Sequence, residues 1–373
     1  MHLPNLSLKD KGQNLLQIAT EYLQHTVAPQ AAQIDREPAI LQQALQGMGD
    51  RCLLALRVPE DLGGGGLSEA DYYHFQILIA RYSGALAFLQ TQHQSAASLL
   101  AASNNKSLQQ LYLPWMGKGE KLVGVGFSQL RRRGKPMMKA LKTEQGYLLE
   151  GEVPWITGFG FFDRFIVGAT LPDGRELYGM VPLQNSQQQS GGVISFSAPM
   201  DLIAMPSTNT VSAKLSGWFL DEAKVITVKA ARAIDENSKK NVLHHGFFAL
   251  GCAYAALDIL ERIYQKKRLF FLHESWQLLK KEVTSCDRAM FAALSSSNSS
   301  YESKLQLRAS AINLAGRCSQ AAVIASSGAA NERDDAAGRV YREALLFSVS
   351  GQTTAVMEQS LKKLLSPTLM SPR

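Results

Sequence analysis

The 373-residue chain contains few cysteines, and they are far apart in the sequence. The four are Cys52, Cys252, Cys286 and Cys318, with no CxxC pair and no histidine cluster beside them. This spacing excludes a recognisable zinc motif and a disulfide framework. We therefore expect four buried thiols and no metal site.

Long apolar stretches are also lacking. The longest near-continuous apolar run covers residues 247–257, which is shorter than the roughly 18–20 residues that a transmembrane helix needs. Residues 1–7 have neither the basic segment nor the apolar core of a secretory signal. The sequence therefore predicts no membrane span and a cytoplasmic location.

Charged residues are scarce, at 19% of the chain against 46% hydrophobic residues. This balance excludes an intrinsically disordered chain, and the length is sufficient for two or three domains. The net charge is +7, and much of the basic excess lies in residues 131–142, which contain no acid. Because this basic run has no interleaved aromatics to stack bases, we do not expect nucleic-acid binding. The run is interpreted as a solvated loop or as a site for an anionic ligand such as a phosphate.

The hydrophobic pattern divides the chain into three predicted domains. Residues 1–120 have apolar side chains at helical spacing. Residues 121–228 contain short apolar stretches separated by turns, which predict a small antiparallel sandwich or barrel. Residues 229–373 return to helical spacing and predict an up-and-down bundle, whose last helix is expected to begin near residues 353–354.

Four short segments follow one another through these domains. They are VPEDLGGGGL at 58–67, YLPWMGKGEK at 112–121, GEVPWITG at 151–158 and YREA at 341–344. In their order, their spacing and the class of structure around each, they resemble the acyl-CoA dehydrogenase superfamily, and the resemblance covers nearly the whole chain. It implies a mainly α fold with an N-terminal helical domain, a middle antiparallel β-barrel or sandwich and a C-terminal four-helix bundle. It also implies an FAD-dependent oxidoreductase of fatty acid metabolism that acts on the CH–CH group of an acyl thioester.

The resemblance assigns flavin contacts to the β domain. In the family a Trp-Ile-Thr strand borders the isoalloxazine ring, and Trp155, Ile156 and Thr157 hold those places here. An aromatic wall and one positioned hydroxyl suit a flat, polarisable ring, although the same residues taken alone could be ordinary strand residues. Phe127 and Ser128 hold the places of the family's loop after the first barrel strand, but the Gly-Ser pair of that loop is missing and the arginine run follows instead.

The resemblance implies further cofactor contacts in the C-terminal bundle. The family's Arg-x-x-Phe-Gly element reaches the flavin of a neighbouring subunit, and it is similar to KRLFF here, in which Lys267, Arg268 and Phe270 are the candidate residues. Gln277 is close to the expected glutamine, and Thr353 precedes the last helix. A homodimer or homotetramer through the bundle, with each FAD shared between subunits, is therefore expected.

The catalytic base of the family is missing at both of its usual positions. The family's dehydrogenation needs a carboxylate that removes the α-proton while the β-hydrogen leaves as hydride. Most members carry this glutamate before the last helix, where Gly351 stands here, and others carry it at the position of Asn241. Neither residue can act as a base, so altered chemistry is expected. His244 and His245, three and four positions beyond Asn241, are the candidate replacements because imidazole titrates near neutral pH.

Several alternatives stay open at this point. The two histidines could instead be packing residues, and His93 is a weaker candidate base on a helix that the resemblance places near the acyl pocket. The function could be that of an acyl-CoA dehydrogenase with a relocated base or of a flavin-dependent monooxygenase-type relative that needs no such base. It could also be that of a non-catalytic member that binds acyl-CoA or a protein partner. The acyl chain length cannot be chosen from the sequence.

Overall fold

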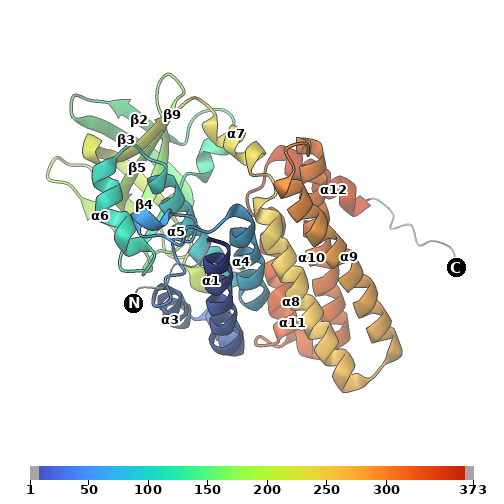
Figure 1. The fold of residues 1–373 in the computed structure, drawn as a ribbon. Helices are drawn as coiled ribbons and strands as arrows, with labels where there is room; N and C mark the ends of the chain where they lie inside the picture. The colour runs from blue at the N-terminus through green and yellow to red at the C-terminus, as the bar shows by residue number, and fades with distance from the viewer. Residues whose placement is uncertain (1–7, 366–373) are drawn as a thin grey trace. The chain divides into compact units, whose positions relative to one another are not determined.

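The computed structural model describes residues 8–365, with helices at both ends of the chain and strands between them (Figure 1). Residues 1–7, on which the expectation about a secretory signal rests, lie outside the described residues. The described chain forms two compact units. Unit 1 contains residues 8–72 and 85–237, and unit 2 contains residues 73–84 and 238–365. The helical, β, helical order of the predicted fold class is confirmed, and the domain boundaries at residues 120 and 228 stay predictions.

The first part of unit 1 is helical. Its helices are α1 (Leu8–Tyr22), α2 (Ala31–Arg36), α3 (Pro38–Gly49), α5 (Gly84–Ala101) and α6 (Lys106–Met116), and α4 (Glu69–Tyr82) passes from unit 1 into unit 2. Helix α6 begins with a side-chain cap, because Asn105 Oδ1 accepts a hydrogen bond from the Leu108 N–H at 3.0 Å. Such a cap satisfies one of the otherwise unpaired N–H groups of the first turn.

Two of the family-like segments pack against each other in unit 1. Gly63 has a φ of +88°, and a Cβ built on it would lie 2.8 Å from Cα of Pro114. Only glycine accommodates both this left-handed conformation and so close a backbone. The Leu54 N–H also donates to the Gly117 carbonyl at 3.4 Å. The glycine-rich segment at 58–67 and the segment at 112–121 therefore form one junction.

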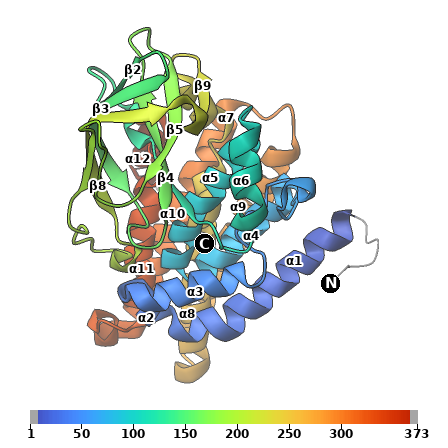
Figure 2. The ribbon, with the colours of Figure 1, turned by 90° about the vertical axis from the view of Figure 1, so that its left-hand side faces the viewer.

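The middle of the chain forms a nine-stranded sheet. Its strands are β1 (Val123–Gly126), β2 (Met138–Lys142), β3 (Gly146–Ile156), β4 (Arg164–Thr170), β5 (Glu176–Pro182), β6 (Ser186–Gln187), β7 (Val193–Phe196), β8 (Val211–Asp221) and β9 (Val225–Lys229). The hydrogen-bonded order is β6-β7-β8-β3-β2-β4-β5-β9, with β1 paired to β4. In Figure 2, β3 and β8 lie at the left of the sheet and β5 and β9 at its right.

Most neighbouring strands are antiparallel, as predicted, but β1 and β2 each run parallel to β4. Parallel pairing requires a crossover connection, and the β2–β3 hairpin forms part of the connection between β1 and β4. The pairing of β1 with β4 holds the C-terminal end of β1 beside the body of the sheet. The loop that follows β1 carries two of the predicted flavin contacts.

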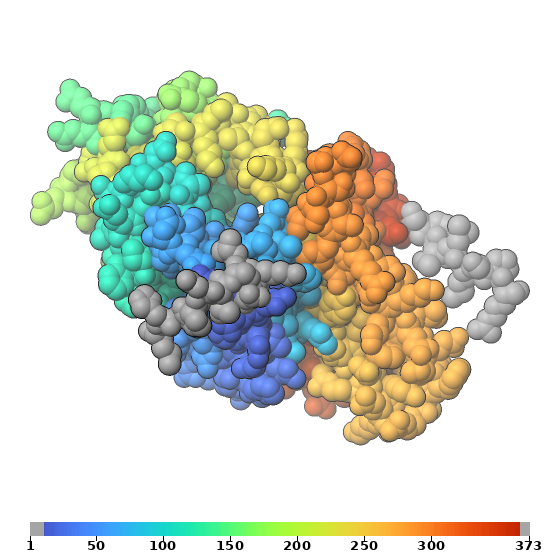
Figure 3. Space-filling model, viewed as in Figure 1, coloured from blue at the N-terminus to red at the C-terminus, as the bar shows by residue number. Residues whose placement is uncertain are grey.

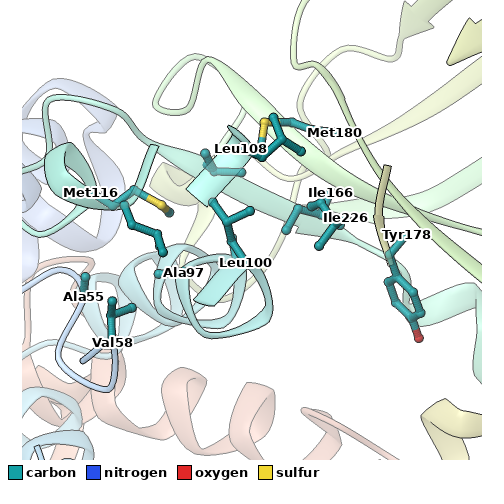
Figure 4. Close-up of a cluster of buried hydrophobic side chains, with 13 residues drawn as sticks. Ala55, Val58, Ala97, Leu100, Leu108, Met116, Ile166, Tyr178, Met180 and Ile226 are labelled. Atoms are coloured by element: carbon teal, nitrogen blue, oxygen red, sulfur yellow. The ribbon is translucent and has the colours of Figure 1, made fainter. Parts of the chain in front are cut away.

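A buried apolar cluster joins helices α5 and α6 to the sheet within unit 1 (Figure 4). Leu100 and Met116 come from the helices, and Ile166, Met180 and Ile226 come from the strands. Burial of each such side chain stabilises the fold by about 1.5–3 kcal/mol. This cluster fixes the helices against β4 and its neighbours.

Unit 2 is a bundle of long helices. They are α8 (His244–Lys267), α9 (Phe270–Ser295), α10 (Tyr301–Ser326), α11 (Ala336–Val349) and α12 (Thr354–Leu365), and α7 (Ala233–Lys240) precedes them. Helices α8 to α11 run side by side in Figure 1, and side chains of α9 and α10 cover the side of unit 2 that Figure 3 shows. The prediction for the last helix is confirmed, because Thr353 Oγ1 accepts the Val356 N–H at 3.2 Å immediately before α12.

No single helix within residues 8–365 is long and apolar enough to cross a membrane. The bent pair of α7 and α8 passes that test on length and composition alone. Helix α8 owes its apolar character to side chains such as Phe247, Leu250 and Leu257, which are buried in unit 2.

The expectation of four buried thiols is wrong at one position. Cys252, Cys286 and Cys318 are buried, whereas Cys52 is exposed. Cys52 lies in the tight turn that ends α3, where its N–H donates to the Gly49 carbonyl at 2.8 Å. Its φ of +57° is that of a turn residue. Turns lie at the protein surface, which explains the exposure.

Candidate functional site

The end of β3 presents an exposed indole beside a buried hydroxyl. Side chains alternate between the two faces of a strand, so Ile156 is fully buried while Trp155 is 49% exposed. Thr157 follows the strand and is buried, with its Oγ1 3.0 Å from Oγ1 of Thr210. The strand geometry therefore leaves the flat aromatic surface of Trp155 open, and the hydroxyl of Thr157, two residues farther along the chain, is positioned by Thr210.

The loop after β1 lies next to this part of β3. A Cβ built on Gly126 would be 3.0 Å from Cγ1 of Val153, two residues before Trp155. Phe127 packs edge-on against Tyr178, with ring centroids 5.6 Å apart. Ser128 then opens the 3-10 helix η4 (Ser128–Arg131) and is partly exposed. Within unit 1 the predicted flavin contacts thus come from two adjacent chain segments.

His93 belongs to the core of unit 1 and has a structural role. It is completely buried on α5. The Val123 N–H donates to Nδ1 at 3.0 Å, and Nε2 lies 3.1 Å from the Met116 carbonyl. Burial lowers the pKa of His93 to about 4. The imidazole links the end of α6 to the start of β1 and is not accessible to a substrate, so the hypothesis that His93 is a base is not supported.

In unit 2 the imidazole of His245 lies directly over Gly351. A Cβ built on Gly351 would be 2.3 Å from Cδ2 and 2.5 Å from Nε2 of His245. Gly351 also has a φ of +61°. A side chain at position 351 would therefore need the space that the imidazole occupies. Nδ1 of the same ring is 2.9 Å from Oγ of Ser350.

A buried arginine holds this loop. Arg308 of α10 is only 3% exposed. Its Nη2 donates to the carbonyls of Ser350 (2.8 Å) and Gly351 (3.0 Å), and its Nη1 donates to the carbonyl of Val242 (3.1 Å). Charged hydrogen bonds of this kind are stronger than neutral ones. The guanidinium therefore ties the end of α11 to the turn that precedes α8, the helix that carries His245 in its first turn.

His244 has a different environment from His245. Its ring meets Tyr73 edge-on, with centroids 5.4 Å apart, and lies 5.3 Å from the His245 ring. Tyr73 in turn stacks on Phe247 at 4.3 Å. Asn241 lies in the turn before α8, and its carbonyl accepts the His244 N–H at 3.0 Å. Of the two candidate histidines, His244 packs among aromatic rings and His245 faces Gly351.

The predicted cofactor residues of the bundle are mostly on the surface. Lys267 Nζ donates to the Ala325 carbonyl at 2.7 Å, and Arg268 ends α8 in a left-handed conformation. Phe270 is 78% exposed and Gln277 is exposed as well. The hydroxyl of Thr353 caps α12. Their roles in cofactor binding stay predictions.

Sequence reasoning missed the residues that organise the two sites. Thr210 supports Thr157, and Ser350 and Arg308 surround His245 and Gly351. A charged side chain on an otherwise apolar and alanine-rich stretch of helix was the available signal for Arg308. No sequence pattern predicts the roles of Thr210 and Ser350, because their side-chain contacts join positions more than 50 residues apart.

Comparisons with known proteins agree with this architecture. Residues 9–120 match the family model "Acyl-CoA dehydrogenase, N-terminal domain". The mitochondrial isovaleryl-CoA dehydrogenase of Pongo abelii is 27% identical over 168 residues, which are 43% of this chain and 40% of that protein. The structure of butyryl-CoA dehydrogenase from Megasphaera elsdenii superposes with a TM-score of 0.79 at 16% identity, over 98% of this chain and 100% of that chain.

Residues 9–120 carry the N-terminal domain of the acyl-CoA dehydrogenase family, and the chain has the fold of the acyl-CoA dehydrogenases. A Bacillus anthracis acyl-CoA dehydrogenase described as complexed with FAD has a TM-score of 0.75 at 18% identity, over 98% of this chain and 69% of that chain. The chain matches about two fifths of the length of the isovaleryl-CoA dehydrogenases. Two of the four family-like segments, at 58–67 and 112–121, fall in or at the edge of the matched range.

The glutamate of the YREA segment at 341–344 is enclosed by other groups of unit 2. Glu343 is fully buried on α11. Its Oε1 is 2.5 Å from Nη1 of Arg339 and accepts the Gly84 N–H at 3.2 Å. Removing one partner of such a buried ion pair leaves an uncompensated charge and is strongly destabilising, so this carboxylate is needed where it is. The side chain of Glu343 is therefore not a replacement for the missing base.

Proposed function

We propose that the protein is an FAD-dependent oxidoreductase of the acyl-CoA dehydrogenase type. Its substrate would be an acyl thioester or a related compound that is oxidised at a CH–CH bond, and His245 would be the proton acceptor in place of the family's glutamate. One observation carries this proposal: the His245 ring occupies the space in which a side chain at position 351 would begin, with Nε2 2.5 Å from that Cβ position. An imidazole therefore stands where the resemblance expects a carboxylate.

The residues of unit 1 fit a flavin. Trp155 exposes half of a large aromatic side chain, although apolar side chains of this size are usually covered. Trp155 would form the wall beside the ring, Ile156 and Phe127 would support that wall, and the hydroxyls of Thr157 and Ser128 would bond its polar edge. Lys267, Arg268, Phe270, Gln277 and Thr353 would supply contacts from the bundle. When bound, FAD supplies the acceptor for a hydride.

A side chain of the protein would accept the proton that leaves the substrate. Forming a Cα=Cβ double bond in an acyl thioester removes a proton from Cα and a hydride from Cβ. Nε2 of His245 would accept the Cα proton, since neutral imidazole is a base near neutral pH. Gly351 would leave room for the ring, and Asn241 would not take part in proton transfer.

The bundle also supports self-association. Helix α11 exposes Tyr341, Leu345 and Val349 at intervals of four residues, and α12 exposes Met357 and Leu361 at the same interval. Side chains four positions apart share one face of a helix. Two exposed apolar stripes on neighbouring elements of the chain favour burial against another copy. We propose a homodimer or homotetramer that forms through unit 2.

The purified protein tests the proposed activity directly. We expect flavin absorbance after purification or after addition of FAD, and anaerobic loss of the oxidised flavin band on mixing with isovaleryl-CoA or a straight-chain acyl-CoA. Colour that persists with every acyl-CoA, combined with a hydroxylated product from NAD(P)H, a reductase and oxygen, would instead identify a monooxygenase. Colourless protein that takes up no FAD would identify a non-catalytic member.

The proposed flavin contact of Trp155 can be tested against a second exposed tryptophan in unit 1. We expect Trp155→Ala to weaken FAD binding about tenfold, because it removes an aromatic contact worth about 1.4 kcal/mol. Trp115 of α6 is similarly exposed, at 42%, but lies outside the predicted contacts. Trp115→Ala should leave the FAD dissociation constant unchanged in an equilibrium titration. Equal losses in the two variants would contradict the assignment.

A further inference from the structure

The hydrogen bond between His245 and Ser350 depends on which nitrogen of the imidazole carries the proton. A neutral imidazole has one N–H and one lone pair, and the partner of one nitrogen decides the state of the other. Nδ1 of His245 is 2.9 Å from Ser350 Oγ. A base can use Nε2 only if Nδ1 is the protonated nitrogen.

The position of Ser350 favours the Nδ1–H form. Ser350 is the residue that ends α11, and its N–H still donates to the Leu346 carbonyl at 3.0 Å. The C-terminal end of a helix carries a partial negative charge, which favours a donor that points toward it. Nδ1–H therefore suits this location better than a bare lone pair does.

Arg308 fixes the serine in place. Its buried guanidinium donates to the carbonyls of both Ser350 and Gly351 and to that of Val242, three residues before His245. Arg308 thus anchors the backbone of Ser350, the backbone of Gly351 and the turn that precedes α8. Rigid support of this kind is what an acid–base group needs if it is to act in one orientation.

We infer that Ser350 and Arg308 are positioning residues that hold His245 in the Nδ1–H tautomer, with the lone pair on Nε2 beside Gly351. Ser350 Oγ accepts a hydrogen bond from Nδ1–H of His245, and Arg308 holds the backbone that carries this hydroxyl. The inference rests on the proposed function for its catalytic meaning, but the tautomer itself is a property of the folded chain. It can be measured without substrate or turnover.

The test uses the full-length protein labelled with 15N only at Nδ1 of histidine. Solid-state 15N NMR at a pH of about 8.5, well above the ordinary histidine pKa, distinguishes a protonated Nδ1 from a bare one. The His245 signal among the seven histidines is identified by its loss in His245→Gln. We expect a protonated Nδ1 in the wild type and in Ser350→Thr, which keeps the hydroxyl, and a bare Nδ1 in Ser350→Ala.

A second serine at the end of α11 provides the control. Ser348 is partly buried, like Ser350, and its hydroxyl donates to the Leu345 carbonyl at 2.7 Å. Ser348→Ala should leave the Nδ1 signal unchanged. A bare Nδ1 in the wild type, or a protonated one in Ser350→Ala, would overturn the inference whatever the enzyme does with acyl-CoA.

Turnover separates this inference from the proposed function. In Ser350→Ala we expect kcat with an active acyl-CoA to fall about 10- to 100-fold with little change in KM, because the wrong tautomer presents no lone pair at Nε2. Ser350→Thr should restore kcat. If His245→Gln retains full turnover while the NMR result is as expected, the base assignment is wrong and the tautomer assignment stands.

Discussion

His93 and His245 are both histidines, but they lie in different units of the molecule and their surroundings give them different roles. His93 is enclosed in unit 1, where backbone groups of Val123 and Met116 contact its two ring nitrogens. His245 is only partly buried in unit 2, and its Nδ1 meets a serine hydroxyl. Backbone partners inside a core fix one protonation state, whereas a hydroxyl partner can donate or accept.

The comparison shows that a histidine's neighbours decide its chemistry. Burial lowers the pKa of His93 to about 4, so this ring stays neutral at physiological pH and holds two chain segments together. The ring of His245 lies over a glycine and is backed by a serine and a buried arginine. Substitutions at these positions should affect stability in the first case and turnover in the second.

The largest expected effect is on catalysis. His245→Ala should lower turnover with an acyl-CoA substrate about 10²- to 10⁴-fold, because it removes the proposed proton acceptor. His74→Ala is the control in the same unit, since His74 is exposed and stacks on Phe291 with centroids 4.0 Å apart. Steady-state rates of both variants, with FAD content matched, make the measurement. Equal turnover in His245→Ala and wild type would remove His245 from the mechanism.

The next effect is on stability and its dependence on pH. The pKa of His93 is about 4 in the folded chain, against 6.5 ordinarily. Between these two pH values the unfolded chain binds a proton at this histidine and the folded chain does not. His93 therefore contributes its full stabilisation above pH 6.5, and this contribution is lost as the pH falls toward about 4. The loss amounts to about 3 kcal/mol in the free energy of unfolding.

His93→Gln measures this contribution. Glutamine can bond the same backbone groups but does not titrate. Urea denaturation from neutral pH to pH 4 should show wild type losing about 3 kcal/mol more than His93→Gln over this range. Parallel pH profiles for the two proteins would show that His93 is not held neutral in the folded state.

Much of the fold could be predicted from the sequence, because periodicity and breakers are local signals. The cap of α12 at Thr353 and the change from strand to helix after residue 229 can be predicted from consecutive residues. The parallel pairing of β1 with β4 cannot be predicted in this way, since it depends on contacts between positions about 40 residues apart. The exposure of Cys52 likewise follows from a turn that composition does not reveal.

The candidate site could be predicted only in part. The absence of the family's glutamate makes Gly351 and the paired histidines the candidate site, but the sequence alone does not show whether His244 or His245 lies beside Gly351. The choice depends on which helix face meets the loop after α11, and this is set by packing. Arg308 reaches that loop from another helix, 42 residues before Ser350.

The smallest effect tests whether the space over Gly351 matters apart from its backbone conformation. Gly351 (φ +61°) and Gly217 (φ +57°) are equally left-handed, but a Cβ on Gly217 would meet nothing within 4 Å. Both alanine variants should lose about 1–2 kcal/mol of stability from the left-handed conformation. Gly351→Ala should lose about 1 kcal/mol more, because its Cβ must displace the His245 ring.

Denaturant unfolding of both variants, in wild type and in His245→Ala, separates the two causes. With the imidazole removed, the extra loss in Gly351→Ala should disappear and its cost should equal that of Gly217→Ala, since the coupling between contacting residues ends when one is truncated. An extra loss that persists without His245 would mean that something other than the imidazole fills the space above Gly351. The role of this glycine would then have to be sought in the loop itself.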